Sequence, residues 1–466
     1  MNSLSSNGYS IVKNIDNVDL IAKIKKDLTV SPKIHTSFGG TPPIFELFRE
    51  NDRKIYMPRC YGLEKFGIPH RNTISEGTHC ENLNFEGTLR KEQEEQVKAF
   101  IDAANNPIKR GGIISVKCAG GKTVMAIYCA CHFKKKTLFI HHKDFLGNQF
   151  KERANMFAPK ARIGIIKQDI IDVVDKDFVI ASLQSLAKRD YPMDIFSDFG
   201  LVIIDECHHT SAEVFSRALI KIVPSMMLGL SATLDRKDGL RKVFEWFIGK
   251  QVLKDKSYKN KQDMIVKTYT FNSHDPDYNA ITVLWNGQVN SVKIINNICN
   301  FFERTKKITN IITEILKNEI DRKILILSER KNQLKVIEKL LDNNYNIGYY
   351  VGGMTREKLK ESENMQIILA TYQMASEGMD IPALNTLILA SPITSIEQSI
   401  GRIQRQLPHE RKYIPMTIDI IDEIDIIKNK FFRRLAFYKK MGFSVEYKQE
   451  QKLEDAQIDF VDDDDI

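Results

Sequence analysis

The chain has 466 residues, of which 42% are hydrophobic and 27% charged, so its composition excludes a fibrous, collagen-like or wholly disordered protein. Because a typical domain has about 150 residues, this length predicts two or three domains, each with a sizeable core. No apolar run approaches the roughly 18 residues of a membrane span, and the N-terminal segment does not resemble a signal peptide. We therefore expect a soluble intracellular protein with no membrane partner.

The net charge of +8 conceals a division within the chain. Residues 449–466 carry eight acidic side chains and one basic side chain, so this tail has a net charge of −7 and the remainder one of +15. The tail is too acidic and too poor in core-forming residues to pack, and we predict that it is disordered. A basic body suits a polyanionic partner such as nucleic acid.

Seven cysteines are present, which is an odd number, and none of them forms a CxxC pair. This pattern argues against a disulfide framework and against a zinc ribbon. The adjacent His208 and His209 are a poor chelate without further ligands nearby in the sequence. We expect reduced thiols and no zinc site.

Three structural regions follow one another along the chain. Residues 1–85 hold few apolar runs and several turn signals, which predicts a small N-terminal accessory domain. From about residue 89, short apolar runs alternate with longer helical patterns, and this rhythm is typical of βαβ units with a parallel sheet. It occurs over 86–250 and again over 301–448, with a polar, irregular stretch between. The predicted fold is therefore α/β, with two successive parallel-sheet domains joined by a linker or insertion at 251–300.

A glycine-containing segment follows the first strand of the first α/β domain and precedes an apolar helix. Small residues there let backbone amides curl around phosphate oxygens, and the helix N-terminus adds partial positive charge. In such a loop Lys122 reaches the β and γ phosphates, and Thr123 ligates Mg²⁺. The strict GxxxxGK[ST] pattern fails only at its first position, Val116. We predict a phosphate loop, with ATP and Mg²⁺ as cofactors, formed by Val116, Lys117, Cys118, Ala119, Gly120, Gly121, Lys122 and Thr123.

A second candidate element, Asp205-Glu206-Cys207-His208, comes directly after the apolar strand LVII. Carboxylates at the C-terminal end of such a strand lie in the crevice where α/β sheets bind ligands. Asp205 can there hold the Mg²⁺ that bridges the β and γ phosphates. Glu206 can orient and deprotonate the attacking water.

A D-E-x-H sequence downstream of a phosphate loop resembles motif II of the superfamily 2 helicases. Further motifs of that superfamily follow in its order, and the similarity covers about 89–420. Leu89–Gln93 is similar to the L-R-x-x-Q element, and Ser231–Thr233 is similar to motif III. Ala370–Asp380 is similar to motif V. Gln398–Arg405 is similar to motif VI, whose pattern is Q-x-x-G-R-x-x-R.

This resemblance implies two tandem RecA-like domains and a role for each motif residue. Gln93 would read the adenine edge, because its amide can donate and accept together. Arg402 and Arg405 would cross the interdomain cleft to the γ-phosphate and complete the hydrolysis site only when the domains close. The remaining nucleotide-binding residues would be Gly378 and Asp380, and those coupling ATP to the strand would be His208, Ser231, Thr233 and Gln398.

Strand-binding residues are also implied by the superfamily, in segments similar to His141–Gln149, Ser182–Ser185 and Thr371. These contacts go to the sugar-phosphate backbone through hydroxyls, amides and helix N-termini. Polar residues at such places are also ordinary helix caps, so each contact stays an open alternative. The residues expected to touch nucleic acid are Lys143, Gln149, Ser182 and Thr371.

The branch of the superfamily is indicated by Ser231–Leu240, which is similar to the SAT-x-x-R-x-D-G stretch of the eukaryotic transcription-repair translocase and the poxvirus transcript-release helicase. Ile55–Gly62 and Phe437–Phe443 resemble helicases of large DNA viruses of poxvirus and asfarvirus type. Departures from the family pattern are Val116, Leu234 in place of the usual proline, and Lys91-Glu92 in place of an aromatic residue. None of them removes a catalytic group.

The resemblance implies a monomeric, ATP-dependent translocase or helicase that acts on DNA in the 3′ to 5′ direction. It would serve viral transcription termination or DNA processing, with transcription machinery as a possible partner. A viral protein of this kind would act in the host cytoplasm, in a virus factory or from within the virion. Two alternatives stay open. One is an RNA helicase with the same ATP-hydrolysing domains, and the other is an ATP-gated nucleic-acid clamp that does not separate strands.

Overall fold

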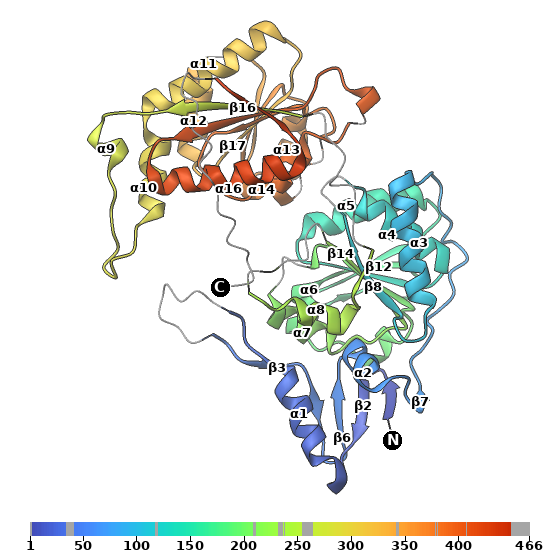
Figure 1. Cartoon of the computed structure of the whole chain (residues 1–466). Coiled ribbons are helices and arrows are strands. Elements are labelled where there is room, and N and C mark those ends of the chain that lie inside the picture. The colour runs from blue at the N-terminus through green and yellow to red at the C-terminus, as the bar shows by residue number, and fades with distance from the viewer. Residues whose placement is uncertain are drawn as a thin grey trace. The chain divides into compact units, whose positions relative to one another are not determined.

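In the computed structural model, the described residues are 2–33, 42–116, 120–207, 211–231, 236, 238–253, 264–341, 344–377, 379, 381–406 and 408–448. The chain divides into two compact units, Met1–Asp255 and Lys256–Ile466 (Figure 1). Each unit contains a large sheet whose neighbouring strands are mostly parallel, and the first unit contains a further, smaller sheet.

The first unit begins with a small domain built on a five-stranded sheet of order β5-β6-β2-β1-β7. Helix α1 buries Ile21, Ile24 and Leu28, whose spacing of three and four residues places them on one face, in the same core as the sheet residues. The elements are β1 (Asn2–Ser5), β2 (Gly8–Val12), α1 (Val18–Leu28), β5 (Arg49–Glu50), β6 (Lys54–Met57), α2 (Arg59–Phe66) and β7 (Arg71–Asn72), with a separate hairpin of β3 (Thr29–Val30) and β4 (Phe45–Glu46).

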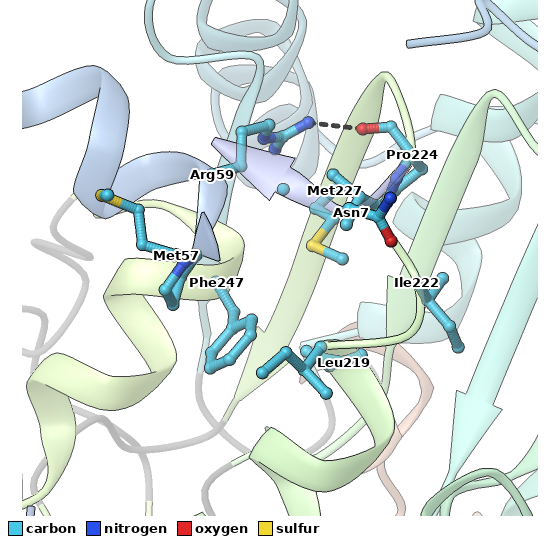
Figure 2. Close-up of a pocket in the computed structure, with 12 residues that line it drawn as sticks. Asn7, Met57, Arg59, Leu219, Ile222, Pro224, Met227 and Phe247 are labelled. Atoms are coloured by element: carbon cyan, nitrogen blue, oxygen red, sulfur yellow. Dashed lines mark hydrogen bonds between the residues drawn. The ribbon is translucent and has the colours of Figure 1, made fainter. Parts of the chain in front are cut away.

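A buried arginine joins this small domain to the α/β domain that follows. Arg59, at the start of α2, donates to the carbonyls of Pro224 (2.7 Å), Ser225 (2.6 Å) and Arg110 (3.1 Å). Figure 2 shows Arg59 reaching Pro224 beside a small, mainly apolar pocket. The pocket is lined from both sides of this contact by Asn7, Gly8, Met57, Pro58, Arg59, Leu219, Ile220, Ile222, Val223, Pro224, Met227 and Phe247.

The first α/β domain is built on an eight-stranded sheet of order β11-β10-β12-β9-β13-β14-β8-β15. Only β10 and β11 run antiparallel; the other neighbours are parallel. The central strands are buried throughout, as expected of a parallel sheet covered on both faces. Strand bounds are β8 (Gly111–Ser115), β9 (Thr137–His141), β10 (Ile163–Lys167), β11 (Ile170–Ile171), β12 (Phe178–Ser182), β13 (Leu201–Ile204), β14 (Met226–Ser231) and β15 (Gln251–Leu253).

Helices cover both faces of this sheet and create two cores. One core contains residues of α3, α4 and α5, and the other contains residues of α6, α7 and α8 and continues into the small N-terminal domain. Successive residues of β9 alternate between them, since Phe139 lies in the first core and Leu138 and Ile140 in the second. The bounds are α3 (Lys91–Asn105), α4 (Lys122–Phe133), α5 (Asp144–Phe157), α6 (Leu183–Lys188), α7 (Ala212–Leu219) and α8 (Arg241–Ile248).

The second unit is built on a seven-stranded sheet of order β18-β19-β17-β20-β21-β16-β22 in which all neighbouring strands run parallel. Every residue of β17 and β21 is buried. Strand bounds are β16 (Ile265–Phe271), β17 (Ile324–Ser328), β18 (Ile347–Tyr350), β19 (Ile367–Thr371), β20 (Thr386–Leu389), β21 (Met416–Asp422) and β22 (Ser444–Tyr447).

This sheet also separates two cores. Ile324 and Ile326 of β17 lie in the core that α10, α11 and α12 share, whereas Leu325 and Leu327 lie in the core that contains residues of α14, α15 and α16. The helices are α9 (Pro276–Asn279), α10 (Ser291–Asn300), α11 (Phe302–Asn318), α12 (Lys331–Leu341), α13 (Arg356–Glu363), α14 (Tyr372–Glu377), α15 (Glu397–Arg402) and α16 (Asp425–Met441).

Two fully buried ion pairs fix helices to the central strand β21. Arg304 of α11 donates to Asp422 (2.5 Å) and to the carbonyl of Ala390 (2.6 Å). Arg434 of α16 forms a bidentate pair with Asp419 at 2.8 Å for each bond. Because both charges of each pair are desolvated, loss of one partner would leave the other buried and uncompensated.

The predicted fold class is confirmed: two α/β parallel-sheet domains follow a small sheet domain. Strand β16 and helix α10 lie within 251–300, which the sequence assigned to a linker. Since β16 pairs with β21 over its whole length, we propose that the second α/β domain begins near residue 264. The polar residues Lys267, Thr268 and Thr270 interrupt the apolar run by which the other strands were recognised in the sequence. The other predicted domain boundaries stay predictions.

Within the described part of the chain, no helix is both long enough and apolar enough to cross a membrane. Six of the seven cysteines are described, and all six are free thiols. Burial raises the pKa of the Cys80 and Cys131 thiols to about 12. These thiols are therefore protonated at neutral pH and chemically unreactive.

Candidate functional site

The glycine-containing loop lies between β8 and α4, at the carboxyl end of a strand next to the sheet's edge strand β15. Gly121 has a left-handed backbone (φ +79°), and a Cβ there would lie 2.1 Å from Nε2 of Gln93. Helix α4 starts at Lys122, and Thr123 is its second residue. Glycine at 121 therefore permits both the turn and the close approach of the Gln93 side chain.

Gln93 links helix α3 to this loop through both ends of its amide. Its Nε2 donates to the Gly120 carbonyl (3.0 Å), and its Oε1 accepts from the backbone N–H of Arg90 (2.9 Å). The side chain is buried. The structure thus places Gln93 against the phosphate loop, as the L-R-x-x-Q element requires, while its predicted contact with adenine stays a prediction.

The acidic pair follows β13, two strands away from β8 in the sheet. The Lys122 ammonium lies 2.9 Å from Oε1 of Glu206, and both side chains are largely buried. Glu206 has a positive φ of 46°, and its backbone N–H donates to Oδ1 of Asp205 (3.0 Å). A non-glycine residue in this backbone region stores strain of a kind that clusters at functional sites.

Asp205 is a buried carboxyl group with a perturbed pKa. Burial is the largest cause, and the neighbouring Glu206 charge adds to it, so that the pKa of Asp205 is raised to about 7 despite the opposing effect of Lys122. Both causes disfavour the carboxylate form. A bound divalent cation would offset both, so this donor set fits Mg²⁺ held by Asp205 and the Thr123 hydroxyl.

The strand between β8 and β13 is β14, which ends at Ser231. The Ser231 side chain is fully buried, and its carbonyl accepts from the N–H of Val116 (3.0 Å). The predicted phosphate loop, motif II and motif III therefore lie at the carboxyl ends of three adjacent parallel strands. This is the carboxyl edge at which α/β sheets bind ligands.

Arg236 and Asp238, which follow motif III in the sequence, form a local ion pair. The Arg236 guanidinium pairs with the Asp238 carboxylate, and its centre lies 4.4 Å from the Phe244 ring. The Asp238 carbonyl also accepts from the backbone N–H of Lys33, in the small N-terminal domain (3.0 Å). The R-x-D element is thus held from both sides within the first unit.

The two arginines of motif VI converge in the second unit. Arg402, the last residue of α15, donates to the carbonyl of Met379 (2.6 Å), and Arg405 donates to the same oxygen (3.2 Å). Gln398 lies in the same short helix. Motif VI therefore contacts motif V directly, through a backbone acceptor that the sequence pattern does not reveal.

Three of the four residues predicted to bind the strand lie at or just after the carboxyl ends of strands, and the fourth, Gln149, lies within helix α5. Lys143 is the N-cap of α5, which contains Gln149, and Ser182 ends β12 and is the N-cap of α6. Thr371 ends β19 in the second unit, opposite Ser328 of β17.

Gln184 connects two of these loops; it lies within the predicted segment Ser182–Ser185 but was not singled out there as a site residue. Its Nε2 donates to the His142 carbonyl (2.6 Å), and its Oε1 accepts from the Ser182 hydroxyl (3.0 Å). The segments similar to His141–Gln149 and Ser182–Ser185 therefore form one connected surface. The sequence signal for this residue was a glutamine next to the start of a helix. Its partner could not be predicted, because a backbone carbonyl has no sequence signature.

Seven predicted site residues lie outside the described residues: Lys117, Cys118, Ala119, His208, Thr233, Gly378 and Asp380. Among the residues whose placement is described, no group of three His, Cys, Asp or Glu side chains is arranged to hold a metal ion.

Comparison with known proteins identifies the family. The family model described as "Type III restriction enzyme, res subunit" matches residues 86–236, and "Helicase conserved C-terminal domain" matches residues 306–407. The chain is 36% identical over 456 residues to the "Putative ATP-dependent RNA helicase" of Acanthamoeba polyphaga mimivirus, covering 94% of this chain and 85% of the relative. The chain is a superfamily 2 helicase.

This helicase is also 28% identical over 458 residues to a "Putative helicase" of Invertebrate iridescent virus 6, covering 92% of this chain and 97% of that relative. It is thus related to helicases of large DNA viruses. Among solved structures, Dbp5 of S. cerevisiae bound to RNA and ADP-BeF₃ has a TM-score of 0.52 at 12% identity and covers 80% of this chain and 95% of its own. That likeness confirms the two RecA-like domains. The helicase is an ATP-dependent nucleoside triphosphate hydrolase.

Proposed function

We propose that this helicase uses ATP hydrolysis to move along one strand of nucleic acid and to separate duplexes. The observation that carries the proposal is the cluster of Lys122, Asp205 and Glu206, which two separate sequence segments bring together at one sheet edge. A phosphate-binding lysine and two carboxylates are the groups that a phosphoryl-transfer site needs in its first domain.

Each residue has a distinct role in this proposal. Lys122 binds the β and γ phosphates of ATP, and Glu206 orients and deprotonates the attacking water. Thr123 and Asp205 would hold Mg²⁺, and the ion would supply positive charge against the transferred phosphoryl group. The Lys122 ammonium and the Glu206 carboxylate form an ion pair at 2.9 Å. Binding of ATP gives Lys122 a phosphate partner and leaves the Glu206 carboxylate available to water.

The second unit contributes the positive charge that completes the reaction. We propose that Arg402 and Arg405 stabilise charge on the leaving phosphoryl group. Their shared acceptor, the Met379 carbonyl, holds both guanidinium groups beside motif V. Because the two halves of the site belong to different units, hydrolysis requires closure on ATP, and loss of phosphate permits reopening. Repeated closure and opening of the two halves of the site would move the protein stepwise along the strand.

We propose Lys143, Gln149, Ser182 and Thr371 as contacts to the sugar-phosphate backbone. The link from Ser182 through Gln184 to the His142 carbonyl supports this proposal, since it joins two loops at the sheet's carboxyl edge. Contacts of this kind position a strand without reading its sequence.

We propose DNA as the preferred polymer, with 3′ to 5′ movement and a role in viral transcription termination or DNA processing. Support comes from the SAT-x-x-R-x-D-G similarity, whose Arg236 and Asp238 form a fixed ion pair. A second candidate is an RNA helicase, which the name of the mimivirus relative favours. Phosphate contacts suit either polymer, whereas selection for RNA requires hydrogen bonds to the 2′-hydroxyl.

Matched oligonucleotides distinguish these candidates. We expect single-stranded DNA to stimulate ATP hydrolysis at least as well as RNA of the same sequence and length, with binding that weakens steeply as salt rises. Displacement assays on 3′-tailed and 5′-tailed duplexes then test direction. Stimulation by RNA alone would establish the RNA helicase, and stimulation without displacement on either tail would leave translocation without strand separation.

A further inference from the structure

Between α9 and α10 of the second unit, the chain forms a hairpin over residues 280–290, here called the Trp285 hairpin. Figure 1 shows this segment extending away from the helices of the unit. Trp285 at its tip is 98% exposed, although tryptophan is one of the largest apolar side chains. The chain has two tryptophans, and the other, Trp246, packs against Tyr61 with ring centroids 5.4 Å apart.

The backbone of the Trp285 hairpin is ordered by hydrogen bonds. Val283 pairs with Val289, the Leu284 N–H donates to the Gln288 carbonyl (2.7 Å), and the Asn290 N–H donates to the Thr282 carbonyl (2.7 Å). The turn is closed by Gly287, whose N–H donates to the Leu284 carbonyl (2.9 Å) and whose φ is +78°. The tip is therefore a defined turn that presents Trp285 in one place.

The base of the hairpin is anchored in the core of the second unit. Tyr278, in α9, is buried, and its hydroxyl donates to Asp422 (2.8 Å), the partner of Arg304. Its ring lies 5.0 Å from that of Phe301. On the other side, Oδ1 of Asn290 caps α10 by accepting from the Lys293 N–H (3.1 Å). Both ends of the Trp285 hairpin are thus fixed to the second unit. A force applied at its tip would therefore be transmitted to that unit.

One face of the hairpin is apolar and exposed. Val283 and Val289 are directly paired, so their side chains share a face, and Ile281 lies on it two residues before Val283. All three are exposed, as is Trp285 at the tip. No residue from 280 to 290 is Asp, Glu, Lys or Arg. This surface cannot bind phosphates, but its chemistry matches the flat, uncharged face of a base pair.

The hairpin also starts from the edge of the sheet at which the strand is proposed to bind. It follows the carboxyl end of β16, which runs parallel to β19, and Thr371 lies at the carboxyl end of β19. Four strand spacings separate β16 from β19, which is about 19 Å at roughly 4.8 Å for each spacing.

We infer that the Trp285 hairpin is a strand-separating wedge, in which Trp285 stacks on the terminal base pair at the junction between single strand and duplex. Apolar side chains that insert beside bases unstack them, and the aliphatic face behind Trp285 excludes water from the exposed step. This inference rests on the proposed function. The competing occupant of the same face is an apolar surface of a partner protein.

Unwinding and ATP hydrolysis must be measured side by side, on a forked duplex and on the single strand alone, in DNA and in RNA. We expect Trp285→Ala to slow unwinding on the order of tenfold while strand-stimulated ATP hydrolysis stays within about twofold of the unsubstituted protein. Trp285→Phe, which keeps an aromatic face, should retain most unwinding. Ile320→Ala is the matched control, because Ile320 is exposed in the same unit and lies outside the hairpin.

Fluorescence of Trp285 in a Trp246→Phe background tests contact directly. We expect quenching by the forked duplex that exceeds quenching by the single strand. Equal unwinding by Trp285→Ala, or fluorescence that no nucleic acid changes, would overturn the inference and assign the face to a protein contact. If the unsubstituted protein shows no strand-stimulated hydrolysis, the proposed function fails instead, and the fluorescence result alone decides on the hairpin.

Discussion

The ammonium of Lys122 lies 2.9 Å from the carboxylate of Glu206, so the cation proposed to bind phosphate is paired with the group proposed to activate water. Lys122→Ala removes the phosphate contact, and we expect ATP affinity to fall on the order of tenfold or more. Glu206→Gln removes the base, and we expect turnover to fall on the order of 10³ with ATP still bound. Nucleotide titration beside phosphate release distinguishes the two failures.

Gly121→Ala should disable the phosphate loop, because its Cβ would lie 2.1 Å from Nε2 of Gln93 and φ is +79°. We expect ATP affinity to fall on the order of tenfold, measured by calorimetry. Gly67→Ala is the matched control, since Gly67 also has a positive φ (+73°) but no atom within 4 Å of the added Cβ. If the two variants bound ATP equally well, the Gln93 contact would have no role in shaping the loop.

Arg405→Ala should lower the strand-stimulated ATPase rate on the order of 10³, as expected for an arginine that acts on the transferred phosphoryl group. The fold should survive, because Arg402 still donates to the Met379 carbonyl. Binding of a single strand without nucleotide should change little. An equal loss of hydrolysis and strand binding would instead make Arg405 a phosphate-backbone contact.

Arg59→Ala should destabilise the first unit by about 3 kcal/mol, because three backbone carbonyls lose a charged donor in a buried setting. Glu64→Gln is the control from the same helix. Glu64 forms an exposed ion pair with Lys250 across the same two domains, and such a pair contributes roughly 0–1 kcal/mol. Chemical denaturation measures both variants, and equal effects would show that Arg59 does not anchor the N-terminal domain.

Much of the first half of the site is readable from sequence because its residues follow continuous apolar runs. Asp205 comes directly after one such run, Ser231 ends a second, and the loop that leads to Lys122 follows a third; parallel strands place their carboxyl ends at one edge. The shared acceptor of Arg402 and Arg405 is not readable, since a backbone carbonyl has no sequence signature. Direct contacts to nucleotide or strand stay predictions for every one of these residues.

The region between the two α/β domains was harder to predict. Strand β16 contains the polar residues Lys267, Thr268 and Thr270 and is only partly buried, so it lacks the apolar run that marked the other strands. The Asn286-Gly287 turn signal was present in the sequence. Exposure of Trp285 depends on how the hairpin leaves the core through Tyr278, and only the three-dimensional structure shows this.

The central claim is that this protein couples ATP hydrolysis to binding of a nucleic-acid strand. The most direct test compares the ATPase rate of the unsubstituted protein with and without saturating single-stranded DNA. We expect the strand to raise the rate at least about tenfold, and Glu206→Gln to abolish the stimulated rate. A rate that neither DNA nor RNA changes, or that persists in Glu206→Gln, would contradict the account.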